Sequence, residues 1–194
     1  MEKAEVNKGK LVVIGGSSGS LQVIINILGR LPNEYPIPVL LIIHRAYSND
    51  SMLLDLLVLK SNLTVREVEE KDKIIPSYVF LAPADYHVLI EKDETFTLDY
   101  SEKLNFSRPS IDVSFISAAE VYGKNLIGIL LSGANEDGAE GLKEIKEQGG
   151  HTIIQHPDEA MVNFMPLQAS HKSKIDEMLD TEGIARYLIS LIPT

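Results

Sequence analysis

The hydrophobic residues of this 194-residue chain fall into two alternating patterns. Short, nearly continuous apolar runs are typical of strands that are buried on both faces. They occur at residues 11–15, 38–43 and 126–131, and a further strand is predicted at residues 151–155. Between these runs, many apolar residues recur at the three- or four-residue spacing of one helix face. This pattern, with its capping residues, predicts helices at 21–31, 52–59, 111–122, 137–148 and 184–191.

The middle of the chain has a different character. Short β-like runs, separated by turn residues, occur at 64–68, 78–81, 87–91 and 95–100, and they predict hairpins attached to a mainly parallel sheet. Strands that alternate with helices indicate a single doubly wound α/β domain, with a mostly parallel sheet between helical layers and an antiparallel hairpin portion. We expect residues 1–10 to form a tail and residues 11–194 to form this domain.

Composition narrows the function classes. The formal net charge of −10 makes nucleic acid and anionic membranes poor partners. The chain has no cysteine, which excludes a thiol nucleophile and thiolate metal sites. No apolar run reaches the roughly 20 residues of a membrane span, so no membrane insertion is expected. The first ten residues lack the apolar core of a signal peptide, and we expect a cytoplasmic protein.

A glycine-rich turn follows the first predicted strand, in the sequence Gly15-Gly16-Ser17-Ser18-Gly19. Such a strand-to-helix turn either holds a phosphate on its backbone N–H groups or presents a nucleophilic serine beside an oxyanion hole. The spacing fits G-x-S-x-G with Ser17 at its centre. It does not fit G-x-G-x-x-G or a P-loop. On the motif alone, a nucleophile, a phosphate loop and a plain tight turn remain open.

A nucleophilic serine needs a base, and His44 is the first candidate. It stands at the end of the second predicted strand, which places it beside Ser17 if the two strands are neighbours. A structural role is the alternative for a single histidine at a strand end. His156, also just past a strand, competes with it. The remaining histidines lie in strand-like runs or in a late polar segment and rank lower: His87, His151 and His171.

The base needs an orienting carboxylate, and Asp137 lies at another strand-to-helix junction. An N-cap of the following helix is the alternative role for Asp137, and the two roles are compatible. Asp158 is a weaker candidate. The order Ser, His, Asp differs from the order Ser, Asp, His of common α/β-hydrolases, so a lipase-type enzyme is disfavoured.

Several segments in a fixed order carry a further signal. They are VVIGGSSG at 12–19, LIIH at 41–44, YVFLAP at 78–83 followed by His87, RPSID at 108–112, SAA at 117–119, LLSG at 130–133 leading to DGA at 137–139, and then Gly149-Gly150, Gln155 and Met165-Pro166. Each is common alone, but their order and spacing are specific. From residue 11 onward the chain resembles the catalytic domain of the chemotaxis protein-glutamate methylesterases, the CheB family.

The resemblance implies a serine hydrolase that removes methyl groups from glutamate γ-methyl esters on the cytoplasmic helices of bacterial chemoreceptors. Related enzymes also deamidate glutamine. By this resemblance Ser17 is the nucleophile, His44 the base and Asp137 the orienting acid. Backbone N–H groups near Ser18 and Ala134 would stabilise the oxyanion. This chemistry requires no cofactor and no metal.

The sequence departs from the family pattern at three places. The loop at 133–135 reads Gly-Ala-Asn where the family has Gly-Met-Gly, although Ala134 can supply the same N–H. The nucleophile segment has Gly16 and Ser20 where the family has alanine and glycine. Ten residues before the first strand are too few for the receiver domain that precedes this domain in the family. We therefore expect no control by phosphorylation of an attached receiver, and access through receptor docking or a separate regulator.

Two rival functions remain. A nucleotide-binding module would use residues 15–19 on phosphate, but it lacks the acidic residue about 20 positions on that would hold a ribose. A non-catalytic receptor- or scaffold-binding relative would have kept the fold, and the altered loop at 133–135 is its support.

Overall fold

The computed structural model describes residues 9–45, 51–104 and 106–193. Of the expected tail, residues 1–8 lie outside this range. The strands are β1 (Leu11–Gly16), β2 (Val39–Ile43), β3 (Thr64–Glu67), β4 (Tyr78–Leu81), β5 (His87–Ile90), β6 (Phe96–Asp99), β7 (Leu126–Leu130), β8 (His151–Gln155) and β9 (Glu177–Leu179). The helices are α1 (Leu21–Leu28), α2 (Met52–Lys60), α3 (Ile111–Tyr122), α4 (Ala139–Glu147), α5 (Phe164–Lys172) and α6 (Thr181–Ser190), with a short 3₁₀ turn, η1 (Gly123–Asn125).

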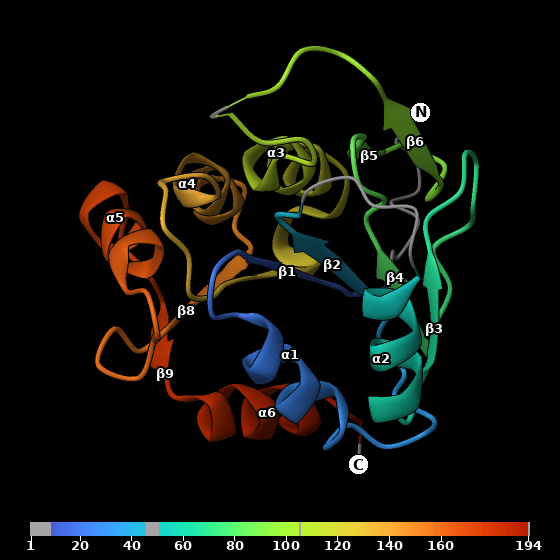
Figure 1. Cartoon of the computed structure of the whole chain (residues 1–194), viewed down its shortest axis with the longest axis horizontal. Coiled ribbons are helices and arrows are strands. Elements are labelled where there is room, and N and C mark those ends of the chain that lie inside the picture. Colours follow the sequence, from blue (N-terminus) through green and yellow to red (C-terminus); the bar gives the residue numbers. More distant parts are fainter. Residues whose placement is uncertain (1–8, 46–50, 105, 194) are drawn as a thin grey trace, which may run out of the picture.

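Seven strands form one sheet in the order β3-β4-β2-β1-β7-β8-β9, and all of its neighbours are parallel. The chain builds outward from β1 through β2 to β4 and β3, and then returns to place β7 on the other side of β1 (Figure 1). Ile14 of β1 is in register with Leu41 of β2 and Ile129 of β7. The reversal at β1 is a topological switch point, where α/β folds place their ligand crevice beyond the carboxyl ends of the strands.

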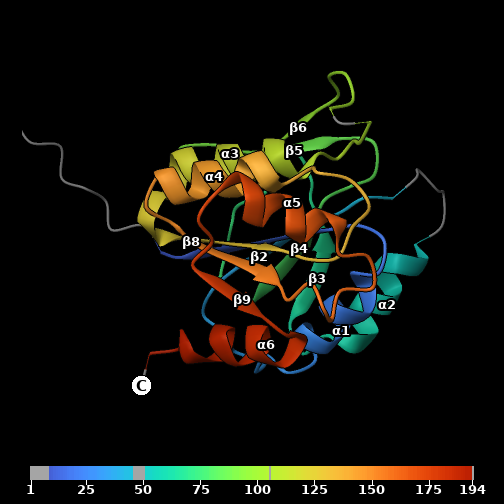
Figure 2. The same cartoon turned by 90° about the vertical axis from the view of Figure 1, so that its left-hand side faces the viewer.

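Two helical layers cover the sheet. Helices α3, α4 and α5 lie on one face, and α1, α2 and α6 lie on the other (Figure 2). Alternate residues of β1 enter the two cores: Leu11 and Val13 pack toward α3 and α4, while Val12 and Ile14 pack toward α1 and α6. Burial on both faces explains why the strand sequences are continuous apolar runs, and it confirms the predicted doubly wound fold.

The predicted hairpins are confirmed only in part. Strands β5 and β6 form a separate two-stranded antiparallel sheet against α3. Strands β3 and β4 are instead parallel members of the main sheet. Residues 68–77 connect them, and this connection is long enough to return the chain to the start of the sheet, which a tight hairpin turn is not.

Two elements were missed by pattern analysis. Helix α5 buries only Met165, Pro166 and Ala169, so its sequence carries a weak helical periodicity. Strand β9 has three residues at the sheet edge, and none of its side chains is fully buried. The last helix also begins earlier than predicted, at Thr181, because the Asp180 carboxylate accepts the Gly183 N–H at 2.5 Å.

Within the described ranges, none of the helices is both long and apolar enough to cross a bilayer.

Candidate active site

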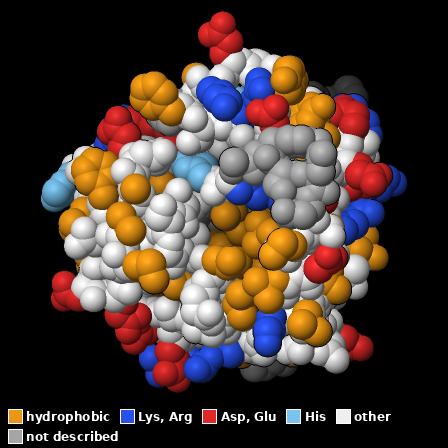
Figure 3. All heavy atoms as spheres, viewed as in Figure 1, with side chains coloured by type: hydrophobic (Ala, Val, Ile, Leu, Met, Phe, Trp, Pro, Cys, Tyr) orange, Lys and Arg blue, Asp and Glu red, His pale blue; other side chains and the backbone are white. Residues whose placement is uncertain are grey.

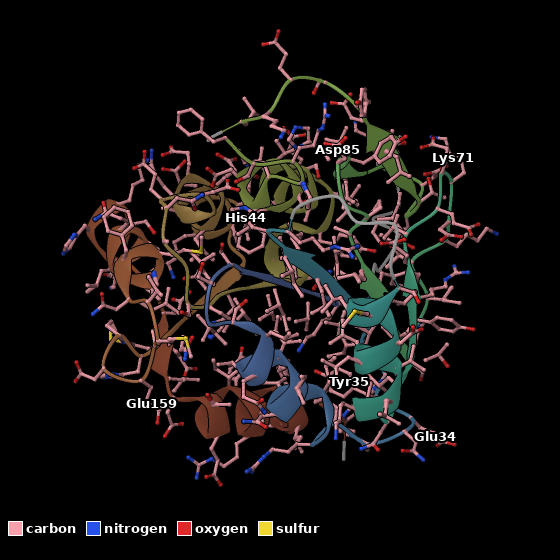
Figure 4. All side chains as sticks on the ribbon, in the orientation of Figure 1. Glu34, Tyr35, His44, Lys71, Asp85 and Glu159 are labelled. Atoms are coloured by element: carbon pink, nitrogen blue, oxygen red, sulfur yellow. The ribbon has the colours of Figure 1, made fainter. Side chains whose placement is uncertain are left out.

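The three residues expected to act together lie at the carboxyl ends of neighbouring strands. Ser17 follows β1, His44 follows β2, and Asp137 lies in the loop after β7. Gly16 pairs with Ile43 in the sheet, and the His44 N–H donates to the Gly16 carbonyl at 3.1 Å. Figure 4 places His44 between the end of β2 and helix α3. The sheet itself therefore sets Ser17 and His44 side by side.

Hydrogen bonds on both sides fix the serine turn. The Ser17 N–H donates to the Ser132 carbonyl at 2.9 Å. The Ser17 carbonyl accepts the N–H of Ser20 at 3.1 Å and the Ser20 hydroxyl at 2.7 Å. Gly19 has a φ of +84°, a backbone conformation that favours glycine. Residue 17 is half-buried at the resulting bend, and its hydroxyl makes no hydrogen bond to the described residues.

The structure explains two departures from the family pattern as one compensated pair. A Cβ on Gly16 would lie 2.5 Å from the Cβ of Ser20 and 2.7 Å from its hydroxyl. Alanine at position 16 therefore needs glycine at position 20, which is the combination of the family. This chain has the reverse arrangement: Gly16 leaves the space, and the Ser20 side chain fills it. Ser20 is fully buried and holds the Ser17 carbonyl.

His44 and Asp137 form the central contact of the site. The His44 Nε2 atom lies 2.7 Å from Oδ2 of Asp137. The Asp137 side chain is fully buried and that of His44 is 10% exposed. Because the carboxylate accepts at Nε2, the other ring nitrogen, Nδ1, is left to face the opening of the site. A buried carboxylate on one imidazole nitrogen is the arrangement that orients a general base.

The Asp137 carboxylate is also held by the N-terminus of α3. Its Oδ2 atom accepts the Ile111 N–H at 2.7 Å, and its Oδ1 atom accepts the Asp112 N–H at 3.0 Å and the Ser110 hydroxyl at 2.9 Å. Burial alone would raise the pKa of Asp137, but the hydrogen bonds from His44 and from the Asp112 and Ile111 N–H groups outweigh it and hold this pKa below the ordinary value. The carboxylate is therefore ionised at neutral pH.

Asp137 does not cap the helix that follows it. Helix α4 begins at Ala139, and its N-cap residue, Gly138, makes no side-chain cap. The cap comes from α3: Oδ1 of Asp112 accepts the N–H groups of Gly138 at 2.9 Å and Gly141 at 2.7 Å. The N-cap alternative for Asp137 is wrong for α4, because its carboxylate instead serves α3.

The backbone near Ser18 and Ala134 contains free donors. In the described part of the chain, the N–H groups of these two residues donate no hydrogen bond to protein atoms. Both residues are exposed. The neighbouring Gly133 N–H is not available, because it donates to the Val162 carbonyl at 3.0 Å. The loop at 133–135 thus keeps an N–H at position 134 although its sequence differs from the family pattern.

Sequence reasoning missed Ser107. Its hydroxyl lies 3.4 Å from Nδ1 of His44, at the far edge of polar hydrogen-bonding range. A cavity of about 300 Å³ opens here, lined by His44, Arg45, Lys103, Phe106, Ser107, Arg108 and Pro109. In Figure 3 a histidine side chain reaches the surface at the place where Figure 4 labels His44. The RPSID segment had marked the neighbouring residues, without indicating a cavity.

The other candidate histidines lie elsewhere. His87 is fully buried; its Nδ1 accepts the Ser110 N–H at 3.0 Å and its Nε2 donates to the Glu102 carbonyl at 3.0 Å. It therefore supports the start of α3 as a neutral imidazole. His151 stacks on Tyr187 at the amino end of β8, and His171 is exposed on α5.

His156 and Asp158 form a local pair. Nδ1 of His156 accepts the Asp158 N–H at 3.3 Å and lies 3.9 Å from its carboxylate. Neither side chain contacts Ser17 or His44 in the described structure. Within the same ranges, no three histidine or acidic side chains gather as they would around a metal ion.

Fold and site together define the class: a doubly wound α/β protein with an ionised Asp–His pair beside a serine turn at the switch point of its sheet. Comparison with known families narrows this class, since residues 12–188 match the CheB methylesterase family. The chain belongs to the CheB methylesterase family.

Known relatives agree. A chain from Leptospira interrogans named as a putative protein-glutamate methylesterase/protein-glutamine glutaminase is 43% identical over 93% of both chains. A protein-glutamate methylesterase/protein-glutamine glutaminase from Carboxydothermus hydrogenoformans is 36% identical, and the match spans 96% of this chain and 56% of that one. The crystal structure of the Thermotoga maritima CheB methylesterase catalytic domain superposes with a TM-score of 0.91 at 32% identity, covering 95% of this chain and all of that one.

Proposed function

We propose that the chain is a protein-glutamate methylesterase that also deamidates glutamine, with Ser17, His44 and Asp137 as its catalytic residues. The observation that carries the proposal is the 2.7 Å contact of His44 with the buried Asp137 carboxylate, directly beside the Ser17 turn. The family membership and the names of the relatives support the same reaction.

The geometry suggests a role for each residue. Nδ1 of His44 takes the Ser17 proton as the hydroxyl attacks the ester carbonyl. The N–H groups of Ser18 and Ala134 receive the developing oxyanion. His44 then gives its proton to the leaving methanol, which leaves an acyl-serine. Water attacks the acyl-serine in the second half of the reaction, with His44 again as base, and releases the glutamate carboxylate.

Deamidation follows the same course with a different leaving group. The carbonyl of a glutamine side chain is attacked, and ammonia leaves in place of methanol. An amide is a poorer electrophile and its nitrogen must be protonated before it leaves, so the imidazolium form of His44 is needed more strongly in this reaction. Both reactions end in the same glutamate product.

Ser107 is the competing nucleophile, since its hydroxyl is the one within range of His44 Nδ1. Ser17 is favoured because it lies at a sharp turn whose neighbours carry free N–H groups, and acyl transfer needs such donors. Ser107 exchanges two backbone hydrogen bonds with Leu104, so its own N–H is already used and cannot serve an oxyanion. Distances between catalytic groups are often long before substrate binds.

We further propose that the substrates are the cytoplasmic helices of bacterial chemoreceptors and that the chain acts in the cytoplasm. The cavity beside His44 suits one extended side chain at the surface of a helix. Nucleic acid is disfavoured by the net charge of −10.

The test is the release of methanol from a methylated chemoreceptor fragment, and of ammonia from its glutamine-bearing form. We expect turnover without added metal or nucleotide. A folded chain that binds the receptor fragment but releases neither product would instead support the non-catalytic relative. A thermal shift with nucleotides, without esterase activity, would support the nucleotide-binding module.

A further inference from the structure

Asp112 lies in the first turn of α3 and holds the start of a different helix. Its Oδ1 atom accepts the N–H groups of Gly138 and Gly141 at 2.9 and 2.7 Å. The first N–H groups of a helix have no partner within that helix, so a side chain from elsewhere must satisfy them when they are buried. Gly138 and Gly141 are both buried. Asp112 therefore caps α4.

Asp137 makes the reciprocal contact, at the start of α3. This residue directly precedes Gly138, and its carboxylate accepts the N–H groups of Ile111 and Asp112 at the start of α3. Each acid thus belongs to the segment that the other acid holds. The closed loop of contacts fixes both helix starts against each other, and with them the backbone from which the Asp137 side chain projects.

Neighbouring contacts add to this clamp. A Cβ on Gly141 would lie 3.2 Å from the Cα of Asp112 and 2.5 Å from the Cβ of Phe115, so the two helices meet without space for adjustment. A Cβ on Gly15 would lie 2.4 Å from Ile111, so β1 also packs tightly on the start of α3. The start of α3 therefore contacts both the strand that leads into the serine turn and the segment that carries the Asp137 carboxylate.

We propose that Asp112 is a positioning residue for the reaction, holding the Asp137–Gly138 backbone so that the Asp137 carboxylate stays on Nε2 of His44. This inference rests on the proposed catalytic roles of His44 and Asp137. Asp112 itself does not line the cavity beside His44. A displacement of about 1 Å in a group that orients catalysis costs on the order of 10²-fold in rate.

The position of the Asp112 oxygen, and not its charge, is what the clamp uses. Burial, together with the nearby Asp137 carboxylate, raises the pKa of Asp112 to about 6, although the hydrogen bonds from the Gly141 and Gly138 N–H groups act to lower it. An ionised group here is thus disfavoured. An asparagine would present the same acceptor oxygen to both N–H groups and place no second charge near Asp137.

The experiment compares Asp112→Asn, Asp112→Glu and Asp112→Ala. We expect Asp112→Asn to keep kcat within about threefold of the unmodified chain. Asp112→Glu keeps the charge but moves the acceptor by one methylene, and we expect it to lower kcat by about 10- to 100-fold with KM changed by less than about twofold. Asp112→Ala should lower kcat at least as much. If Asp112→Ala does not fold, the difference in kcat between Asp112→Asn and Asp112→Glu still tests the proposal.

A second measurement reads the contact directly. The proton on His44 Nε2, hydrogen-bonded to a buried carboxylate, gives a strongly downfield-shifted ¹H resonance. We expect this resonance in the unmodified chain and in Asp112→Asn, and its loss or marked shift in Asp112→Glu. It reports the His44–Asp137 contact whether or not the chain hydrolyses esters, so failure of the proposed function and failure of this inference are distinguishable.

Asp180→Ala is the matched control. Asp180 caps α6 through the Gly183 N–H, as Asp112 caps α4, but lies away from the site. We expect Asp180→Ala to lower the melting temperature and to leave kcat and the His44 resonance unchanged. A folded Asp112→Glu variant that has the same kcat and the same His44 resonance as the unmodified chain would overturn the proposal. So would loss of both in Asp112→Asn, since that would show that the charge is required.

Discussion

Nε2 of His44 donates to the ionised Oδ2 of Asp137 across 2.7 Å, which fixes the proton of the neutral imidazole on Nε2. The lone pair then belongs to Nδ1, the nitrogen that lies 3.4 Å from the Ser107 hydroxyl. A general base must offer its unprotonated nitrogen to the nucleophile. In the proposed mechanism Nδ1 is therefore the atom that accepts the serine proton, and each residue of the site can be tested separately.

Replacing Ser17 with alanine should abolish hydrolysis without unfolding the chain. Loss of a nucleophile typically lowers turnover by 10³-fold or more, and position 17 is only half-buried. Methanol release and a thermal melt on the same sample check this. Ser18→Ala, one residue further on, keeps its backbone N–H and should stay active. If Ser107→Ala is inactive while Ser17→Ala turns over normally, Ser107 is the nucleophile.

His44→Gln should remove activity, whereas His156→Gln should leave it within about twofold. His44 contacts the buried Asp137 carboxylate, while His156 pairs with the exposed Asp158. The loss of a triad histidine costs several powers of ten in turnover. Initial rates on one methyl-ester substrate compare the two variants. A greater loss in His156→Gln would show that the base has been misassigned.

Asp137→Asn should lower both turnover and stability. Turnover should fall by roughly 10⁴-fold, because an amide cannot hold the same imidazole tautomer. Stability should fall by about 1–3 kcal/mol, because an amide NH₂ group would face N–H donors at the start of α3. Denaturant unfolding and kinetics on one preparation give both values. A destabilised variant with full activity would leave Asp137 with a purely structural role.

Asp112→Asn should stabilise the chain at neutral pH. The folded pKa of Asp112, about 6, lies above its ordinary value of 3.8. A raised pKa means that stability is fully present below pH 3.8 and is lost as pH rises through about 6. Asparagine avoids this loss, which is on the order of 3 kcal/mol for the rise from 3.8 to about 6. The free energy of unfolding, measured from pH 4 to pH 7.5, should favour the variant increasingly with pH. A constant difference would contradict the prediction.

Gly16→Ala should be destabilising alone and tolerated together with Ser20→Gly. The new Cβ would meet the Ser20 Cβ at 2.5 Å, and overpacking of this kind costs about 1–3 kcal/mol. Glycine at position 20 removes the atoms that collide. Melting of the two single variants and the double variant gives the coupling energy. Independent, additive effects would show that the two positions do not share the space.

Much of the fold was predictable because its strands are buried on both faces. The runs at β1, β2 and β7 contain no polar side chain, and the doubly wound order follows from the alternation of strands with helices. The direction of β3 and β4 was not predictable, because short half-buried strands look alike in parallel and antiparallel sheets. Helix α5 was not predicted because few of its residues are buried in the core.

The site was predictable where single strands position it, and unpredictable where two helices meet. Ser17 and His44 follow neighbouring strands, so their proximity could be expected from the sequence. The partners of Asp137 at the start of α3 could not, since they lie about 25 residues earlier in the chain and backbone N–H groups carry no sequence signal. Ser107 and the cavity beside His44 depend on how a loop folds over the sheet edge, which no residue pattern records.

The shared space of Gly16 and Ser20 constrains how such a site changes during evolution. A lineage that moves between this arrangement and the alanine–glycine pair must pass through a single substitution. Starting from this chain, Gly16→Ala first forces two atoms together in the turn that carries Ser17. If Ser20→Gly comes first, the change leaves a small void and removes the hydrogen bond from the Ser20 hydroxyl to the Ser17 carbonyl. We therefore expect the evolutionary intermediate to have glycine at both positions 16 and 20. Intermediates with a side chain at both positions should be selected against.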